Sequence, residues 1–145
     1  MAIRFSVQSG DFELPEAPKV QKWVTEVVRS RGKSVGNINY LFCDDEYLLA
    51  VNLQYLQHDT YTDIITFDYV VGGLVSGDIL ISVERVRENA ASLGVSFEQE
   101  LHRVIIHGVL HLLGHGDKSD AEATEMRRQE EGALVLWNTM FREEQ

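Results

Sequence analysis

Three histidines and one aspartate lie within a single eleven-residue stretch, HGVLHLLGHGD, at positions 107–117. On a helix, His107 and His111 would be one turn apart, about 6 Å along the axis, with both imidazoles on one face. On the same continued helix, His115 would lie about 12 Å from His107, too far to share an ion with bonds of about 2.1 Å. Glycine, however, commonly follows the last residue of a helix, where the backbone becomes left-handed. The stretch therefore predicts that the helix ends at Gly114 and that the chain then folds back.

A chain that folds back after Gly114 can bring Asp117 to the two histidines. A catalytic zinc ion takes three protein ligands and keeps one position for water, so His107, His111 and Asp117 would form a suitable set. The ion would lower the pKa of its water to about 7 and polarise an ester or amide oxygen. His115 is the alternative third ligand, because a residue between two glycines could also turn inward. The residues thus predict one divalent metal ion, with zinc expected, in a site suited to hydrolysis.

The residue after His107 bears on which class of metal-dependent enzyme the sequence can encode. Zinc peptidases with the signature H-E-x-x-H carry their general base at that position. Here the position is Gly108, which has no side chain and allows close approach of another backbone or a substrate. A peptidase of the zincin type is therefore disfavoured. His102 lies five residues before His107, on another helix face, and we expect it to face solvent.

Length and composition favour one folded domain over residues 1–145. Hydrophobic residues make up 44% of the chain and charged residues 25%, as in globular proteins. The only cysteine is Cys43, which excludes a disulfide within the chain and a cysteine-rich zinc module. No apolar run approaches the roughly 20 residues of a membrane span, and the N-terminal segment lacks the apolar core of a signal peptide. We expect a cytoplasmic protein without a membrane partner.

The chain is acidic, with a formal charge of −10, so attraction to a polyanion is not the default. Residues 34–84 contain no Lys or Arg. A nucleic-acid partner would need local positive charge, part of which a bound metal could supply; the alternative is that the acidity belongs to a solvated surface. The last predicted helix carries four glutamates that we expect on such a face, although they could also dock a basic partner protein: Glu122, Glu125, Glu130 and Glu131. The same helix carries four apolar residues that we expect in the core: Met126, Leu134, Leu136 and Trp137.

Hydrophobic periodicity and turn residues predict nine elements in the order β-α-β-α-β-β-α-α-α. Two capping boxes mark helix starts: Ser96 with Gln99 opens the helix that carries the histidines, and Ser119 with Glu122 opens the last helix. Strands are expected over 3–8, 37–42, 63–70 and 77–82, and the other helices from Pro15 to Gly32, from Asp44 through Leu53, and over 83–93. The order predicts an α+β (mixed α/β) fold: a small mixed four-stranded sheet packed with about five helices, with a zincin-like metal site.

The sequence resembles the YbeY-type rRNA maturation endoribonucleases. Their signature H-G-x-L-H-L-x-G-Y-D-H corresponds to HGVLHLLGHGD at 107–117. Their stretch L-N-x-x-Y-R-x-x-D-x-P-T-D-V-L-S-F corresponds to VNLQYLQHDTYTDIITF at 51–67, and their GDI-x-IS to GDILIS at 77–82. Size and element order agree over the whole chain.

The resemblance implies a compact α+β fold with a zinc-like site beside a groove. It implies a single-strand-specific endoribonuclease that acts in small-subunit rRNA 3′-end maturation and ribosome quality control. The two matching histidines become metal ligands, and Asp117 takes the third-ligand position, where the family has histidine. The carboxylate has a shorter reach, lowers the site's charge and favours a harder ion.

The resemblance also identifies residues of the substrate groove. Thr62, Asp63 and Thr66 match the family's groove strand, although turn chemistry and strand pairing explain Asp63 equally well. The family's arginine falls on Leu56, which cannot hold a phosphate. His58 nearby could take over part of that function if protonated. His115 remains a weak candidate for the proton acceptor.

The resemblance implies that a metal-bound water or a ribose 2′-hydroxyl attacks the phosphodiester, while the ion stabilises charge on the phosphoryl oxygens. It implies that the catalytic residues are His107, His111 and Asp117. One rival hypothesis is a non-catalytic ribosome-assembly factor whose metal only stabilises the fold, which Leu56 and the cation-free stretch favour. The other is a small metallopeptidase, which Gly108 disfavours. Expected partners are single-stranded RNA, namely the small-subunit rRNA precursor, and ribosomal proteins.

Overall fold

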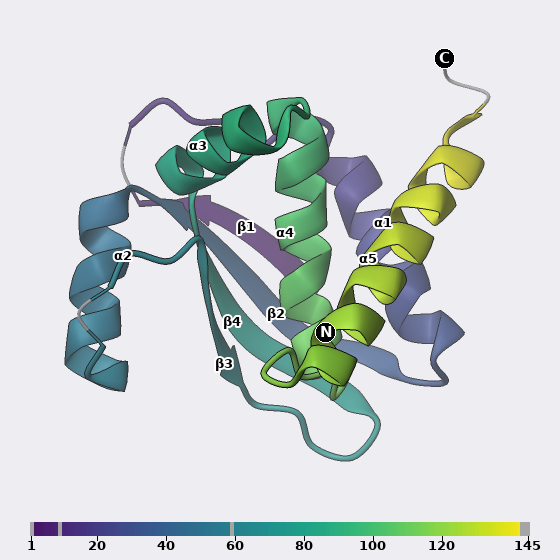
Figure 1. The fold of residues 1–145 in the computed structure, drawn as a ribbon. Helices are drawn as coiled ribbons and strands as arrows, with labels where there is room; N and C mark the ends of the chain where they lie inside the picture. The colour runs from purple at the N-terminus through teal and green to yellow at the C-terminus, as the bar shows by residue number, and fades with distance from the viewer. Residues whose placement is uncertain (1, 9, 59, 143–145) are drawn as a thin grey trace.

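Four strands form one mixed sheet in the order β1-β2-β4-β3 (Figure 1). We describe residues 2–8, 10–58 and 60–142 of a computed structural model. Strands β1, β2 and β4 run parallel, and the edge strand β3 runs antiparallel to β4. The strand bounds are β1 Ala2–Val7, β2 Ser34–Cys43, β3 Ile64–Asp68 and β4 Leu74–Ser82. The predicted four-stranded mixed sheet is confirmed.

Five α-helices surround this sheet (Figure 1). Their bounds are α1 Ala17–Ser30, α2 Asp45–Val51, α3 Val83–Leu93, α4 Phe97–Leu112 and α5 Asp120–Met140. Helix α2 continues as a π-helical turn, η1, over Asn52–Leu56. No helix in the described part of the chain combines the length and apolarity needed to cross a membrane. The predicted α+β class is confirmed.

Helix α4 lies across one face of the sheet, with α1 and α5 beside it (Figure 1). Its residues join those of α1, β2 and β4 in the main hydrophobic core, in which Trp23, Ile79 and Ile105 have no exposed surface. A smaller cluster on the other face packs Leu48 of α2 against Ile65 and Leu80. Helix α4 is therefore held on several sides, and its C-terminal end is fixed relative to β3 and β4.

Gly108 allows α4 to lie close to the sheet. A Cβ atom at this position would lie 2.9 Å from Ile79 Cγ2, closer than real Cβ atoms approach, and 3.0 Å from Ile64 Cδ1, a very tight contact. The close approach that the sequence predicts at Gly108 is therefore an approach to the sheet's own side chains.

Capping side chains fix the N-terminal starts of helices α4 and α5. The Ser96 side chain accepts a hydrogen bond from Gln99 N at the start of α4. At the start of α5, Ser119 and Glu122 form a complete capping box. Both predicted helix starts are confirmed, and α3 ends at Gly94 as expected.

Several element bounds differ from the predicted ones. Strand β3 ends at Asp68 rather than at residue 70, because Asp68 Oδ1 accepts a hydrogen bond from Val70 N and turns the chain. Strands β2 and β4 begin earlier than expected, since Ser34 pairs with Leu74 beyond an irregularity between Val35 and Ile38. The sheet therefore extends further at this end than hydrophobic alternation alone indicates.

Candidate metal centre

Two imidazoles and one carboxylate converge at the C-terminal end of α4. His111 Nε2 lies 3.0 Å from His107 Nε2. Asp117 Oδ2 lies 3.3 Å from each of these nitrogens. Among the described residues, these three form the one group of His, Cys, Asp or Glu side chains placed to hold a metal ion. The three residues that the sequence nominates as ligands are thus brought together.

The spacing of these three atoms suits a tetrahedral ion. Zinc, with bonds of about 2.0–2.1 Å, places its tetrahedral ligand atoms about 3.3–3.4 Å apart. The separations of 3.0, 3.3 and 3.3 Å match this edge length closely. Three protein ligands leave a fourth position, as in catalytic metal sites. The donor set therefore fits a divalent ion with room for a water or a substrate oxygen.

The loop after α4 places Asp117 opposite the histidines. Gly114 has a φ of 101°, in the left-handed region that favours glycine, and ends the helix as predicted. His115 N then donates to Leu110 O at 3.0 Å, which turns the chain back. At Gly116 a Cβ atom would lie 2.7 Å from Glu122 Oε2, so the glycine lets the loop pass the capping carboxylate of α5. Asp117 is consequently held between two ordered helix ends.

A buried carboxylate from α5 supports the first histidine. Glu130 Oε2 lies 2.5 Å from His107 Nδ1, and Glu130 is 4% exposed. When Nδ1–H donates to this carboxylate, the lone pair of Nε2 faces the metal centre. Arg103 links the same carboxylate to Glu100, with Nη1 donating to Glu130 Oε1 at 3.1 Å and Nε to Glu100 Oε1 at 2.9 Å. Burial raises the pKa of Glu130, but the His107 hydrogen bond and the Arg103 charge outweigh it and lower that pKa overall.

The prediction that Glu130 belongs to a solvated acidic face is therefore wrong. Glu122 and Glu131 are exposed as expected, whereas Glu130 lies on the buried side of α5. Its position could have been found from the helical spacing of the predicted core residues, because Glu130 follows Met126 by one turn and precedes Trp137 by two. Met126 is buried, and Leu134, Leu136 and Trp137 pack against the core as predicted.

His102 is also buried, contrary to the prediction that it faces solvent. It is 5% exposed, and its ring centroid lies 4.2 Å from that of Trp137 and 5.6 Å from that of Trp23. Burial lowers the pKa of His102 to about 4, so its ring is neutral at pH 7. The physical reason is that α1 and α5 cover the side of α4 that points away from the metal centre.

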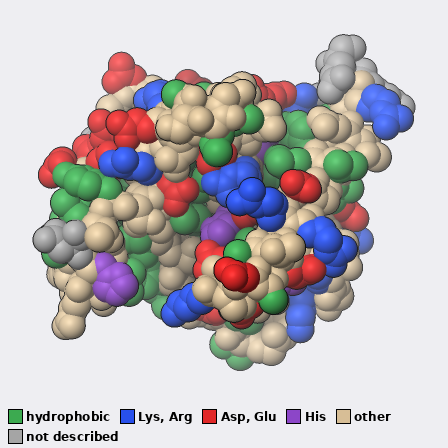
Figure 2. Space-filling model, in the orientation of Figure 1, with side chains coloured by type: hydrophobic (Ala, Val, Ile, Leu, Met, Phe, Trp, Pro, Cys, Tyr) green, Lys and Arg blue, Asp and Glu red, His purple; other side chains and the backbone are tan. Residues whose placement is uncertain are grey.

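A cleft of about 660 Å³ opens beside the metal centre, between α4, β3 and η1. On the face shown in Figure 2, Lys and Arg side chains lie next to a histidine over α4, with Asp and Glu side chains around them. The cleft lining includes His107, His111 and Asp117, together with the predicted groove residues His58, Thr62, Asp63 and Thr66. His115 is not among its lining residues, so the structure does not bring this candidate to the cleft.

Comparison with known proteins shows the family of this chain. The family model for Endoribonuclease YbeY matches residues 5–138. The chain belongs to the YbeY family. An Endoribonuclease YbeY of Flavobacterium psychrophilum is 56% identical over 128 residues, 88% of this chain and 91% of the relative. One from Porphyromonas gingivalis is 56% identical over 117 residues, 81% of this chain and 78% of the relative.

A solved structure supports the same fold. The solution structure of a Thermotoga maritima protein superposes with a TM-score of 0.67 at 25% identity, and the match covers 98% of this chain and 93% of that one. The fold shared with that structure therefore extends over nearly the whole chain.

Asp63 is a half-buried groove residue in this YbeY-family cleft. Its carboxylate accepts a hydrogen bond from Asn89 Nδ2 at 3.4 Å and lies 3.9 Å from Arg103 Nη2. Burial raises the pKa of Asp63 above its ordinary value, although Arg103 and His107 oppose the shift. Its backbone carbonyl also accepts from Ser82 N, so Asp63 has a structural contact as well. A carboxylate with a raised pKa beside a metal centre is suited to exchange a proton.

Leu56 stands in the cleft wall where the YbeY signature has arginine. It ends the η1 turn, is 44% exposed and lines the cleft together with His58. An apolar side chain provides no hydrogen-bond donor for a phosphate. This wall of the cleft therefore lacks a fixed positive charge.

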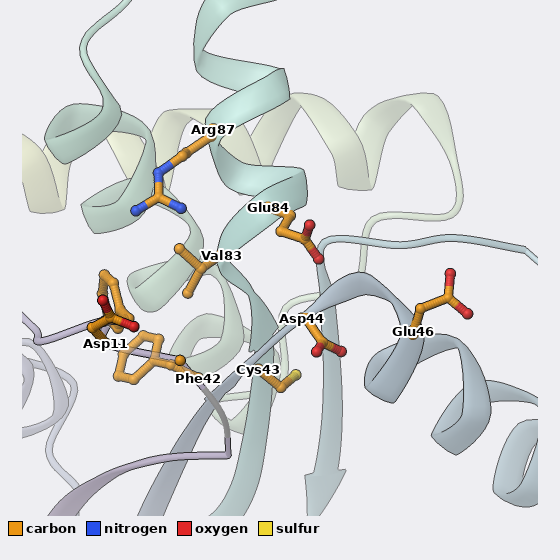
Figure 3. Close-up of a pocket in the computed structure, with 10 residues that line it drawn as sticks. Asp11, Phe42, Cys43, Asp44, Glu46, Val83, Glu84 and Arg87 are labelled. Carbon is orange, nitrogen blue, oxygen red and sulfur yellow. The ribbon is translucent and has the colours of Figure 1, made fainter.

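A second cavity, of about 640 Å³, lies at another part of the surface, between the end of β2 and the start of α3 (Figure 3). Its lining includes four carboxylates, Asp11, Asp44, Glu46 and Glu84, and one guanidinium, Arg87. Two of these carboxylates accept hydrogen bonds from backbone N–H groups: Asp44 from Tyr47 N, and Glu84 from Asp45 N. Burial raises the pKa of Cys43 in the same lining to about 12, so its thiol stays protonated. The acidic lining disfavours a polyanion, and the metal-centre cleft remains the candidate functional site.

Proposed function

We propose that this YbeY-family protein is a metal-dependent endoribonuclease, acting as one domain over residues 1–145, that cleaves single-stranded RNA. Its proposed substrate is the 3′ region of the small-subunit rRNA precursor. The observation that carries the proposal is the convergence of His107, His111 and Asp117 beside a cleft, at separations that suit one ion.

The proposed ion is zinc, held by His107, His111 and Asp117. When bound, it would polarise a phosphoryl oxygen and make an attacking water more acidic. His107 keeps its Nε2 lone pair directed at the centre because Glu130 accepts from Nδ1. Thr62 and Thr66 line the cleft and offer hydroxyl groups that can orient the ribose or the phosphate.

Asp63 is the proposed proton acceptor. Its carboxylate lies in the cleft, and burial brings its pKa closer to neutrality than that of an exposed aspartate. A base of this kind takes the proton of the attacking hydroxyl, whether that group is a water or a ribose 2′-hydroxyl. His115 does not line the cleft, which removes the main support for its candidacy.

Replacement of His111 by alanine tests the proposal. We expect His111→Ala to lose bound zinc in elemental analysis and to lose cleavage of a single-stranded RNA in the same preparation. His115→Ala serves as the matched control, because His115 lies outside the ligand group and should retain both properties. Loss of zinc with unchanged cleavage would remove the ion from the mechanism.

Leu56 keeps a second candidate function open, a ribosome-assembly factor whose metal only stabilises the fold. The apolar η1 wall favours it, and the exposed Glu122 and Glu131 of α5 could meet basic ribosomal proteins. A folded Asp117→Ala variant that lacks nuclease activity but still supports rRNA maturation in cells would favour this function. A metallopeptidase is disfavoured, since Gly108 packs against Ile79 and supplies no base.

A further inference from the structure

The metal-centre cleft contains little positive charge for an RNA-binding site. Among its described lining residues, Lys118 is the only Lys or Arg, whereas Asp63, Asp68 and Asp117 bring three carboxylates. The β3 and η1 walls come from the stretch over 34–84 that has no basic residue. Any fixed cation that meets an RNA phosphate inside this cleft must therefore come from the opposite, α4–α5 side.

Lys118 decides whether the formal charges in the cleft balance. With a divalent ion bound and the three carboxylates ionised, the ammonium brings the sum of formal charges to zero. Without Lys118 the sum would be negative, and an RNA backbone would be repelled. Contacts between cations and phosphates dominate the affinity of proteins for single-stranded nucleic acids.

The position of Lys118 suits a contact with substrate. It follows Asp117, which lies at the metal centre, and precedes Ser119, which caps α5 through hydrogen bonds with Glu122. Its backbone is thus fixed on both sides, while its side chain is exposed in the cleft. Within the described chain, no ion pair or hydrogen bond holds its ammonium.

The neighbouring arginine cannot take this role. The Arg103 guanidinium binds Glu100 through two nitrogens, at 2.9 and 2.5 Å, and Glu130 through a third at 3.1 Å. These three hydrogen bonds hold it in the network behind His107, and moving it toward a phosphate would leave the buried Glu100 and Glu130 carboxylates unpaired.

We propose that Lys118 is the phosphate-binding residue of this cleft, and that its ammonium pairs with an RNA phosphate next to the bond held at the metal centre. The inference rests on the proposed nuclease function. It places the phosphate-binding cation on the α4–α5 loop, in the same cleft that Leu56 lines from η1.

The test is equilibrium binding of a fluorescein-labelled ten-nucleotide RNA to zinc-loaded protein, followed by anisotropy at several salt concentrations. We expect Lys118→Ala to weaken binding about 5- to 10-fold at low salt, uniformly across RNA sequences. The slope of log Kd against log salt should fall by about 0.7, the value for one phosphate contact with a single strand. Lys118→Arg keeps the charge and should bind within about 3-fold of the wild type. Lys22→Ala, at an exposed lysine of α1, is the matched control and should leave Kd and slope unchanged.

Each other outcome overturns the inference. An unchanged Kd and salt slope in Lys118→Ala would show that the ammonium meets no phosphate. Loss of zinc from this variant would assign Lys118 to the stability of the metal centre. Slower cleavage at saturating RNA with an unchanged Kd would assign it to the chemical step. If the wild type cleaves RNA and only the Lys118 effect is missing, this inference fails alone; if the wild type does not cleave, the proposed function fails.

Discussion

His107 Nδ1 lies 2.5 Å from Glu130 Oε2, so a buried carboxylate on α5 holds the imidazole that α4 presents to the metal centre. The contact joins residues 23 positions apart and couples the packing of two helices to the orientation of one ligand. Arg103 also pairs with this carboxylate at 3.1 Å, which makes its burial tolerable. The orientation of His107 in the candidate metal centre therefore depends on Arg103 and Glu130, which both lie outside the 107–117 motif.

Glu130→Gln should weaken zinc binding about 10- to 100-fold, since partners behind a ligating histidine contribute about this much to metal affinity. The amide can still meet Nδ1, but it lacks the charge that fixes the tautomer and balances Arg103. Competition with a chelator of known affinity measures the effect. Glu131→Gln, at the exposed neighbouring position, should bind zinc as the wild type does. Equal affinities for Glu130→Gln and the wild type would show that the contact does not orient His107.

The geometry around the ligand motif follows from local rules. Helical spacing places His107 and His111 on one face, and Gly114 ends α4 with a left-handed backbone. The capping box at Ser119 begins α5 immediately afterwards. Between these two signals only a short loop remains, so Asp117 has little choice of position. For this reason the sequence predicts the convergence of the three groups.

The two residues that were wrongly expected at the surface, Glu130 and His102, are buried by contacts between segments far apart in the sequence. His102 looks like a surface residue when α4 is considered alone, and the polar character of Glu130 hides the helical spacing that groups it with Met126 and Trp137. Their burial arises where α5 and α1 pack around α4, and Trp23 and Trp137 enclose His102. The π-helical turn over Asn52–Leu56 likewise has no simple residue signature, although Asn52 is buried and donates to Thr60 O. Packing partners far along the chain cannot be assigned from periodicity alone.

Gly108→Ala should destabilise the protein by about 1–3 kcal/mol, the usual cost of extra volume in a packed core. The added methyl would lie 2.9 Å from Ile79 Cγ2 and 3.0 Å from Ile64 Cδ1 and would push α4 away from the sheet. Urea unfolding measures the change. Gly132→Ala is the matched control in the middle of α5, where a Cβ atom would meet nothing within 4 Å. It should stabilise the protein by about 0.5–1 kcal/mol. Equal stabilities of the two variants would contradict the close packing at Gly108.

His102 should make the protein less stable as the pH falls from about 6.5 to about 4. Its pKa is about 4 in the folded protein, below the ordinary value of about 6.5, so the unfolded chain takes up the proton first. The contribution of His102 to the free energy of unfolding is therefore complete above pH 6.5. It decreases below that pH, by on the order of 3 kcal/mol at pH 4. His102→Phe keeps an aromatic ring between Trp23 and Trp137 but cannot titrate.

Urea unfolding of the wild type and His102→Phe at pH 7, 6, 5 and 4 tests this dependence. As the pH falls, the free energy of unfolding should decrease more in the wild type than in His102→Phe. Titration of the carboxylates should affect both proteins alike. Parallel curves for the wild type and His102→Phe would mean that His102 does not titrate at a lowered pKa in the folded protein.

Asp117→His should shift the metal preference of the centre toward zinc. Asp117 contributes a 40% exposed carboxylate 3.3 Å from each histidine nitrogen, where the YbeY signature has an imidazole. Carboxylates suit manganese and magnesium better than imidazoles do, so the substitution should raise the ratio of zinc to manganese affinity about 10-fold or more. Parallel competition titrations with the two metals measure this ratio. Asp120→His, three residues further along in the first turn of α5, should leave it unchanged. If Asp117→His and Asp120→His gave the same ratio as the wild type, the carboxylate of Asp117 would not be a ligand, and the centre would consist of the two imidazoles alone.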